Sequence, residues 1–440
     1  MLFKNISILS EDFELLEDMY VGIQGDRIAY IGNETPEHFC DFIKDNKIYD
    51  GKGLLLMSGF YNAHTHSPMT LLRGYGENMM LNDWLNKKIF PYEAELTIDS
   101  VYWGTMLAIA ESLMSGIVSS TDMYYFSPAV AKAVLDSGVK MNISRALVNF
   151  DGANPLDMAS YAEMDEFCSE YHMKGMGRLR ADVSIHAEYT SDPSTCMAVA
   201  EYGKANNLNA HIHLSETKNE HEGCRARHGK TPAEYFSDLG IFDIPCTAAH
   251  CVWLEDEDFD ILHEKGVTVA SCPVSNMKLA SGIADTAKMI DKGINLALGT
   301  DSVASNNSLN FFEEMKFMAL GIKAWKSNPA ILSPADVLRA ATLGGAKSQG
   351  RKDCGAVSIG NKADLIAVNL DTPNMQPIHE IANNLVYSAS PADIVLTMVD
   401  GRILYERGEF TTLDIEKIIA NVGLENGRIL GNLERGNSIG

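Results

Sequence analysis

The sequence has no pair of cysteines in C-x-x-C spacing, no run of about 18 apolar residues, and far fewer basic than acidic side chains. Its eight cysteines are scattered. This pattern excludes a zinc ribbon and a disulfide scaffold and indicates reduced thiols. The paired H-x-E and P-C-x-x-C signature of the zinc deaminases that act on cytidine is also missing. A deaminase in this chain must therefore use another fold.

The 59 acidic and 36 basic side chains give a formal net charge of −23. Such a charge repels phosphates, so we expect neither polymeric nucleic acid nor a membrane as partner. The first 20 residues lack a basic segment followed by an apolar stretch, which predicts a soluble cytoplasmic protein. The 440 residues accommodate a barrel of roughly 250 residues and a second, smaller domain.

Short apolar runs alternate with amphipathic segments, an order that indicates βα units around a parallel sheet. Eight runs are predicted as strands: Leu54–Phe60, Ile117–Met123, Val139–Val148, Leu179–His186, Asn209–Leu214, Thr247–Val252, Val267–Ser271 and Ile294–Leu298. Helices are predicted between them, for example over Ser100–Met114 and Asp256–Lys265. A closed (β/α)8 barrel is favoured. The alternative is a doubly wound open sheet, but no G-x-G-x-x-G follows the first strand.

The flanking segments differ from the centre because both are rich in β-signals. Met19–Gly32 and Thr397–Tyr405 read as hairpins, with turns at Gly25-Asp26 and Asp400-Gly401, and Ala363–Leu370 adds a strand. We therefore predict a small β-sandwich built from both termini. The predicted domains are residues 1–55 (first part of the sandwich), 56–349 (a metal-dependent barrel) and 350–440 (second part of the sandwich and a tail).

Residues suited to metal binding stand where the predicted barrel strands end: His64, His66, His186, His213, Glu216, His250 and Asp301. Strand ends form a ring around one mouth of a barrel, so these residues are expected to meet there. The alternation of a strand points His64 and His66 to the same side. His64, His66, His213 and Asp301 make an N3O set with room for a water, as in catalytic zinc sites. His211 points the same way but deeper and is expected to be an interior histidine.

Several motifs in chain order resemble the amidohydrolase superfamily. They are Asn62-Ala63-His64-Thr65-His66, Leu71-Leu72-Arg73-Gly74, His213-Leu214-Ser215-Glu216-Thr217, His250-Cys251, Ser275-Asn276 with Lys278-Leu279 and Ser281-Gly282-Ile283, and Gly299-Thr300-Asp301 with Ser305-Asn306-Asn307. Within that superfamily the chain is most similar to the 5-methylthioadenosine and S-adenosylhomocysteine deaminases, a group that includes 5′-deoxyadenosine deaminase. The likeness covers essentially the whole length.

The resemblance implies one divalent metal, zinc or alternatively Fe²⁺, held by His64, His66, His213 and Asp301. A two-metal site would ordinarily use a bridging group from the fourth strand, where this chain has His186. The implied reaction is hydrolysis at carbon 6 of adenine with release of ammonia. Glu216 is then the acid that protonates ring nitrogen 1, Asp301 accepts the proton of the water, and His250 orients the nucleophile.

The resemblance also implies the residues that bind the substrate, a small nucleoside. Glu93 holds the ribose hydroxyls, since a carboxylate accepts from both hydroxyls of a diol. The others are His186 at the adenine edge, Ser305 near the base, Arg145 towards the ribose or its 5′ substituent, and Trp84 as an apolar wall. Large barrels of this type commonly form symmetric homo-oligomers. If these residues have no part in the site, Glu216 and Glu93 are expected to be surface carboxylates and Trp84 is expected to be a core residue.

The chain departs from the family pattern at positions that bear on specificity. No arginine stands between Arg145 and Arg178, where relatives that hold the carboxylate of S-adenosylhomocysteine carry a second one, and Ile185 and Glu188 replace common prolines. An uncharged 5′ substituent is therefore as plausible as homocysteine. Two alternatives stay open: a deaminase of a free base such as guanine or a triazine hydrolase on the same site, and a catalytically inactive scaffold of the same fold.

Overall fold

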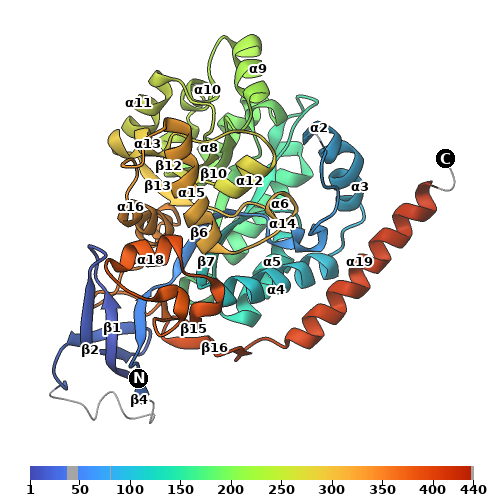
Figure 1. Cartoon of the computed structure of the whole chain (residues 1–440). Coiled ribbons are helices and arrows are strands. Elements are labelled where there is room, and N and C mark those ends of the chain that lie inside the picture. The colour runs from blue at the N-terminus through green and yellow to red at the C-terminus, as the bar shows by residue number, and fades with distance from the viewer. Residues whose placement is uncertain (37–47, 80, 438–440) are drawn as a thin grey trace.

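A computed structural model describes residues 1–36, 48–79 and 81–437 of the chain. A closed parallel barrel forms its centre, a separate β-sheet lies at the amino-terminal end of the barrel strands, and a long carboxy-terminal helix lies along one side (Figure 1). The predicted fold class, a (β/α)8 barrel with a β-domain from both termini, is confirmed. Within the described residues, none of the helices is both long and apolar enough to cross a bilayer.

Eight parallel strands pair in chain order to form the barrel. They are β6 (Phe60–Thr65), β7 (Ile117–Met123), β8 (Lys140–Leu147), β9 (Leu179–Ile185), β10 (Ala210–Leu214), β11 (Cys246–His250), β12 (Thr268–Ser271) and β13 (Asn295–Leu298). A parallel bridge between Thr65 and Asp301 closes the ring. The amide of Asp301 donates to the carbonyl of His64 over 3.0 Å. The closing contact thus brings two predicted metal ligands together.

The first predicted strand, Leu54–Phe60, is wrong as a single barrel strand. β5 (Leu54–Ser58) belongs to the terminal sheet and β6 to the barrel, with Gly59 between them. A side chain at Gly59 would come within 2.3 Å of Val118, so only glycine lets the chain pass this close to the neighbouring strand. The run is mostly apolar because both strands are buried at every residue, with side chains of β5 alternating between the core of the terminal sheet and that of the barrel, and periodicity cannot reveal such a break.

Helices connect the barrel strands and cover the outside of the barrel. The longer ones are α4 (Ile98–Met114), α5 (Ser127–Ser137), α6 (Ala159–Tyr171), α8 (Pro193–Asn206), α9 (Lys218–His228), α10 (Pro232–Asp238), α11 (Asp256–Glu264), α13 (Thr286–Asp291), α15 (Phe311–Lys326) and α16 (Pro334–Arg339). Shorter helices at the mouth are α2 (Leu81–Trp84), α3 (Phe90–Glu93), α12 (Pro273–Lys278) and α14 (Val303–Asn306), whereas α17 (Gly345–Ser348) contacts the amino-terminal ends of the barrel strands. The helix predicted over Asp256–Lys265 is confirmed as α11, with Gly266 just past its end at φ +65°.

The terminal strands form one nine-stranded sheet. Its strands are β1 (Leu2–Leu9), β2 (Leu15–Gln24), β3 (Arg27–Gly32), β4 (Ile48–Asp50), β5, β14 (Leu365–Asn369), β15 (Ile394–Val399), β16 (Arg402–Glu406) and β17 (Glu409–Phe410). The sheet curls, because an antiparallel bridge joins Arg27 of β3 to Lys362, three residues before β14 begins. Both predicted hairpins are present, as β2–β3 and β15–β16. Buried side chains of the two halves share an apolar core of their own.

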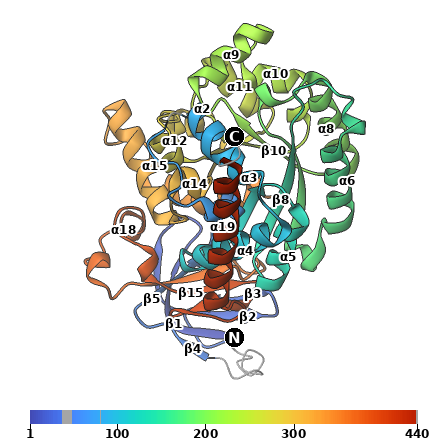
Figure 2. The same cartoon turned by 90° about the vertical axis from the view of Figure 1, so that its right-hand side faces the viewer.

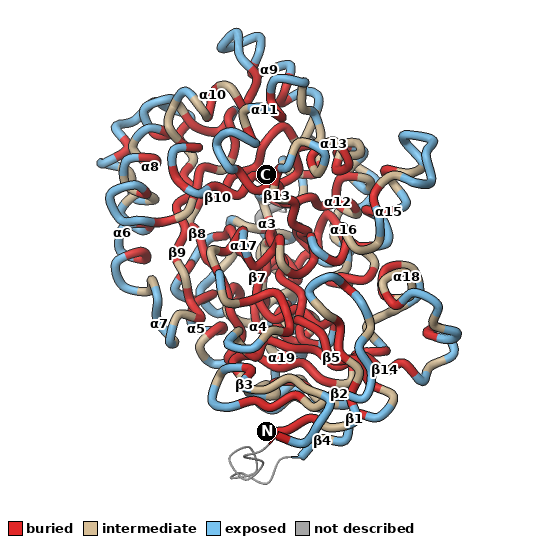
Figure 3. The backbone as a smooth tube through the Cα atoms, turned by 90° about the vertical axis from the view of Figure 1, so that its left-hand side faces the viewer, coloured by how far each residue is buried: buried red, intermediate tan, exposed pale blue. Residues whose placement is uncertain are grey.

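Buried residues lie both in the barrel and in the terminal sheet (Figure 3), and their apolar side chains pack into a large core and this small one. The strands β5, β6, β7 and β10 are buried at every residue. The seven described cysteines are all buried and unpaired, whereas Cys40 lies outside the described residues. The predicted domain limits at 55/56 and 349/350 stay a prediction.

The carboxy-terminal tail contains a 23-residue helix, α19 (Ile415–Asn437), that the sequence analysis did not predict. It lies along α3 and α4 (Figure 2). Tyr92 of α3 donates to Asn426 over 2.8 Å, and Arg428 donates to the carbonyl of Glu95 over 3.0 Å. Because α3 also carries Glu93, this helix braces one wall of the barrel mouth.

A buried ion cluster joins the barrel to the terminal sheet. Lys140 of β8 lies 2.5 Å from Asp364 and 2.7 Å from Asp400, and all three side chains are less than 10% exposed. Tyr61 of β6 also donates to Asp364 over 2.8 Å. Removal of this ammonium group would leave Asp364 buried without its ion partner and Asp400 with only Lys362, 3.8 Å away.

We therefore expect Lys140→Met to lower the free energy of unfolding by about 3–5 kcal/mol, the usual cost of breaking a buried ion pair on one side. Burial alone would raise the pKa of Asp364, but the ammonium group of Lys140 holds that pKa below its ordinary value. The contribution of Asp364 is thus present above its unfolded pKa of about 3.9 and is lost as the pH falls through its folded pKa. Thermal unfolding checks both points: the two proteins should differ most near neutral pH and converge in acid. Lys132→Met, at an exposed pair with Asp136, is the control.

Candidate metal-centred active site

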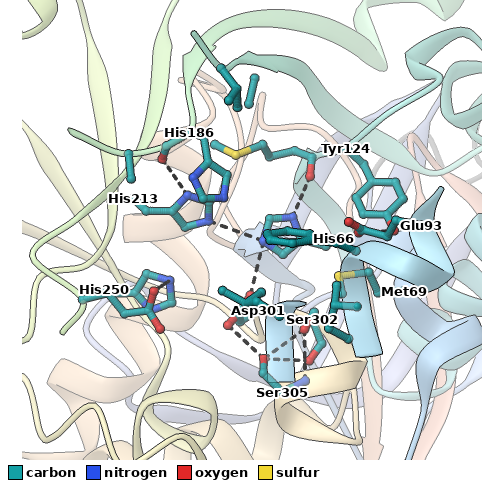
Figure 4. A pocket seen from close by; sticks show the side chains of 18 of the residues that line it. His66, Met69, Glu93, Tyr124, His186, His213, His250, Asp301, Ser302 and Ser305 are labelled. Atoms are coloured by element: carbon teal, nitrogen blue, oxygen red, sulfur yellow. Dashed lines mark hydrogen bonds and ion pairs between the residues drawn. The ribbon is translucent and has the colours of Figure 1, made fainter. Parts of the chain in front are cut away.

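A cavity opens at the carboxyl ends of the barrel strands (Figure 4). Its empty volume, which includes the open mouth, is about 980 Å³. Apart from His64, every residue that the sequence analysis assigned to the site lines it: Trp84, Glu93, Arg145, His66, His186, His213, Glu216, His250, Asp301 and Ser305. His64 is fully buried just beneath. The structure thus brings the whole predicted set to one place.

The four predicted metal ligands point at a common centre. His66 Nε2 lies 3.4 Å from His213 Nε2. Asp301 Oδ1 lies 3.5 Å from His64 Nε2 and 3.4 Å from His66 Nε2. His64, at the end of β6, and His213, near the end of β10, also fall with His250 into a second group whose nitrogens lie within 4.8 Å of one another. Three imidazoles and a carboxylate at these separations are the ligand types that zinc prefers.

Backbone carbonyls fix the orientation of two of these rings. His66 Nδ1 donates to the carbonyl of Met123 over 2.6 Å, and His213 Nδ1 donates to the carbonyl of His186 over 2.7 Å. A carbonyl oxygen only accepts, so Nδ1 carries the proton and the lone pair of Nε2 faces the centre. Burial also holds the pKa of His213 well below its usual value, which keeps the ring neutral. Ligand histidines commonly have such a partner behind them.

His64 tests whether the centre fits a cation. Its Nε2 is buried, makes no hydrogen bond within the described residues, and faces the centre. Burial lowers the pKa of His64 to about 4, so the ring is neutral and offers a lone pair. Its Nδ1 lies 2.8 Å from Nε2 of His211, the histidine predicted to be interior, which is fully buried. Because a buried polar atom without a partner is costly, the residues fit a divalent metal at this point.

Two serines hold the remaining predicted ligand. Asp301 follows β13 and accepts from Ser275 over 2.5 Å and from Ser305 over 2.9 Å, both at Oδ2. Its Oδ1 therefore stays directed at the histidines. Burial opposes ionisation, but the nearby imidazoles of His64, His250 and His66 hold the pKa of Asp301 well below its usual value. The carboxylate is thus ionised, as a metal ligand must be.

Glu216 and His250 lie next to each other, beside the metal ligands. Glu216 Oε2 lies 3.9 Å from His250 Nε2, and Glu216 Oε1 accepts weakly from Ser281 over 3.5 Å. Burial raises the pKa of Glu216, which favours a carboxyl that can give up a proton. Although burial acts against it, the carboxylates of Glu216 and Asp301 raise the pKa of His250. An acid and a hydrogen-bond donor therefore flank the same space.

The backbone at this mouth is unusual. His250 has φ +73° and Asp301 φ +57°, and Ser215, directly before Glu216, has φ +47°. Non-glycine residues rarely adopt this left-handed conformation, and it costs of the order of 1–3 kcal/mol each. The contacts around the strand ends maintain it and aim the side chains into the cavity.

The opposite wall carries Glu93, which is predicted to hold the ribose, and Trp84, which is predicted to form an apolar surface beside it. Trp84 ends α2, and Glu93 ends α3 after a π-helical turn, η2 (Leu85–Ile89). Tyr124 donates to Glu93 over 2.7 Å. Burial raises the pKa of Glu93 even though this hydrogen bond acts the other way. Glu93 faces the cavity instead of the outer surface, and Trp84 is buried in the barrel core and also lines the cavity.

The remaining predicted substrate residues come from the third and fourth strands. His186 follows β9, and burial lowers its pKa to about 4; its Nδ1 is buried without a hydrogen bond within the described residues. A neutral imidazole with an unpartnered nitrogen suits recognition of a base edge. Arg145, on β8, donates through Nε to Glu163 of α6 over 2.8 Å. This ion pair was not predicted.

Sequence analysis missed the residues that orient the predicted ones. Asn276 accepts from His250 Nδ1 over 2.8 Å. Glu220 accepts from the amides of Ser215 and Glu216, both over 2.8 Å, and so anchors the turn that carries Glu216. Asn276 belongs to the Ser275-Asn276 motif, for which the sequence analysis predicted no role. Glu220 gave no signal beyond its place one helical turn after Glu216.

Comparison with known proteins places this geometry in a family. Residues 55–404 match the amidohydrolase family. The chain belongs to the amidohydrolase family. A curated relative from Thermoanaerobacter pseudethanolicus, named 5-methylthioadenosine/S-adenosylhomocysteine deaminase, is 39% identical and covers 96% of this chain and 97% of its own. A relative from Methanosarcina mazei, named 5′-deoxyadenosine deaminase, is 38% identical over 95% of each chain.

Solved structures of amidohydrolases share the fold. The crystal structure of an adenosine deaminase from Xanthomonas campestris with bound zinc is 28% identical, with a TM-score of 0.90 over 98% of both chains. Atrazine chlorohydrolase from Arthrobacter aurescens superposes with a TM-score of 0.88 over 97% of this chain and 99% of its own. At 22% identity this second likeness shows the fold alone. The histidine-rich centre thus belongs to a metal-dependent family, one of whose solved members holds zinc.

Proposed function

We propose that this protein is a metal-dependent hydrolytic deaminase that converts a 5′-modified adenosine into the corresponding inosine analogue and ammonia. The observation that carries the proposal is the meeting of the His64, His66, His213 and Asp301 group with Glu216 and His250 in one cavity. The relatives named for 5-methylthioadenosine, S-adenosylhomocysteine and 5′-deoxyadenosine support this substrate class. We further propose zinc as the metal, with Fe²⁺ as the alternative that elemental analysis distinguishes.

The four proposed ligands would hold the metal by three Nε2 atoms and Oδ1 of Asp301. A bound divalent metal lowers the pKa of water from about 15.7 towards 7 and so supplies a nucleophile at neutral pH. With the metal bound, the ionised carboxylate of Asp301 would take up the proton of the nucleophilic water. His250 donates from Nε2 to the attacking oxygen, with its ring held in place by Asn276.

Glu216 supplies the proton that the adenine ring needs. Attack at carbon 6 places negative charge on ring nitrogen 1, and an acid in hydrogen-bond reach neutralises it. Burial raises the pKa of Glu216, which favours its protonated form. Glu220 accepts hydrogen bonds from the amides of Ser215 and Glu216. These bonds anchor the turn that carries Glu216 and so fix the direction of the proton transfer. The proton taken up by Asp301 would pass to the leaving amine, which departs as ammonia, and the remaining hydroxyl proton would restore the carboxyl of Glu216.

Glu93 adapts the site to nucleosides, because it can bind their ribose. It lies across the cavity from Glu216 and is positioned by Tyr124 and by the brace of α19 on α3. A carboxylate here accepts from both ribose hydroxyls, and each charge-assisted hydrogen bond contributes about 1.5–3 kcal/mol. Trp84 forms an apolar wall beside it, and His186 and Ser305 lie on the side of the base.

We expect Glu93→Gln to raise the KM for 5-methylthioadenosine about 10- to 100-fold, since the loss of one charge-assisted hydrogen bond is worth that factor. The metal content should stay unchanged, because Glu93 is not among the ligands. Steady-state kinetics with elemental analysis checks both. Glu264→Gln, an exposed carboxylate at the end of α11, is the control. An unchanged KM would contradict the assignment of Glu93 to the ribose.

A panel of substrates tests the function itself. Ammonia release is measured with 5-methylthioadenosine, 5′-deoxyadenosine, S-adenosylhomocysteine, adenosine, adenine, guanine and a chlorinated triazine. The proposal expects turnover of adenine nucleosides and little of the free bases or the triazine. Turnover of guanine or triazine alone would favour the alternative chemistry on the same site. No turnover and no bound metal, even after zinc or iron is added, would favour an inactive scaffold. The cytoplasmic location and the homo-oligomer stay predictions.

A further inference from the structure

A second cavity adjoins the proposed nucleoside site. It lies between α3, the start of α5 and the face of α6, and Phe90, Glu93, Tyr125 and Arg145 line both cavities. Glu93 is the proposed ribose ligand, so a group attached to the far end of the ribose meets this second space. The argument that follows rests on the proposed function.

The walls of the second cavity are largely aromatic. Phe90, Tyr125 and Phe126 are 50%, 38% and 40% exposed, unusually high for large apolar side chains at a cavity. Phe167 and Tyr171 stack behind them with ring centres 5.0 Å apart. Exposed apolar surface of this kind marks a binding site. A short alkyl or thioalkyl group would find contacts here.

The charge of the second cavity is acidic. Its lining contains four glutamates, Glu93, Glu163, Glu166 and Glu170, against one basic side chain, Arg145. Glu163 accepts from Arg145 Nε over 2.8 Å, and Arg145 Nη1 donates to the carbonyl of Ala146 over 2.6 Å. The guanidinium also lies over the ring of Tyr125, 5.0 Å from its centre. The one cation that could receive a carboxylate is therefore already paired.

We infer that this second cavity binds the 5′ substituent of the substrate, and that Glu163, by pairing with Arg145, makes it select against a substituent that carries a carboxylate. A carboxylate brought to Arg145 must compete with Glu163 and is repelled by it. Glu163 and Arg145 are 58% and 17% exposed, so the repulsion is screened by salt. The preferred substrates are adenosines whose 5′ group is apolar and uncharged, or ends in an ammonium group without a carboxylate.

Three nucleosides that differ only in this group test the inference: 5-methylthioadenosine, S-adenosylhomocysteine, and the 5′-thioether of adenosine with 3-aminopropanethiol, which keeps the ammonium and lacks the carboxylate. Wild-type protein is expected to have its lowest kcat/KM for S-adenosylhomocysteine. Glu163→Gln should raise the ratio of kcat/KM for S-adenosylhomocysteine to that for 5-methylthioadenosine about fivefold, the scale of an interaction between partly exposed charges. It should lower the corresponding ratio for the aminopropyl compound.

Salt and a matched variant make the result specific. Both shifts should shrink when the salt concentration is raised from about 0.05 M to about 0.5 M, because the screening length falls well below 10 Å. Glu264→Gln removes the same charge far from the cavity and should leave both ratios as in wild type. Equal ratios in wild type and Glu163→Gln, or a wild-type preference for S-adenosylhomocysteine, would overturn the inference. Turnover of none of the three nucleosides by wild type would instead contradict the proposed function.

Discussion

Glu216→Gln is expected to lower kcat for 5-methylthioadenosine by about 10²–10⁴-fold, the usual contribution of a positioned general acid. Glutamine has nearly the same shape as glutamate but no proton that it can transfer to ring nitrogen 1. The cavity, the metal ligands and the two hydrogen bonds that Glu220 accepts from the backbone amides should persist. The variant should therefore bind as much metal as wild type. Single-turnover kinetics and elemental analysis of the same sample measure the two quantities.

A matched control lies on the next helix. Glu222 is an exposed glutamate of α9 that pairs with Lys218, and Glu222→Gln should leave kcat unchanged. Since general acid catalysis is local, only the loss at Glu216 should matter. If Glu216→Gln keeps kcat within about tenfold of wild type with its metal in place, the role of Glu216 as the acid is wrong.

His213→Ala is expected to remove the metal together with the activity. His213 is the ligand from β10, and its Nε2 lies 3.4 Å from that of His66, so two imidazoles and one carboxylate would remain. Partners behind the ligands typically contribute 10–100-fold to metal affinity, and loss of a ligand itself should exceed about 100-fold. Metal content after purification measures this loss independently of catalysis.

Thermal unfolding supplies a second measurement of the same claim. Added zinc should raise the Tm of metal-free wild-type protein, because a ligand at 1,000 times its Kd stabilises by about 4 kcal/mol. The same addition should leave the Tm of His213→Ala nearly unchanged. His263→Ala, at an exposed histidine of α11, should behave as wild type. Full zinc-dependent stabilisation of His213→Ala would place the metal elsewhere.

The barrel and the ring of site residues were predictable because both depend on local order in the sequence. Strands of four to eight mostly buried residues alternate with helices, and five of the eight strand ends carry a residue suited to metal binding or acid chemistry, as at His213 in β10 and His250 in β11. Since parallel strand ends meet at one mouth, the pattern alone predicts which residues converge. Their hydrogen-bond partners do not follow from the pattern.

The features that were missed depend on contacts between distant segments. The break at Gly59 follows from the close approach of Val118. The role of Asn276 follows from its contact with His250, 26 residues away. The helix α19 mixes exposed apolar residues such as Ile419 and Leu424 with buried ones such as Ile418 and Ile429, and its contacts with α3 span more than 300 residues. The pairing of Arg145 with Glu163 likewise joins a strand to a helix surface.

Hydrolysis in water enriched in oxygen-18 tests the central claim most directly. Metal-replete protein is incubated with 5-methylthioadenosine, and the product and the ammonia are followed by mass spectrometry and by an ammonia assay. The account predicts one ammonia for each inosine analogue formed, with a single labelled oxygen on carbon 6 of the base, and no product from metal-free protein. Unchanged substrate with the metal bound, or a product cleaved at the sugar instead of the base, would contradict it.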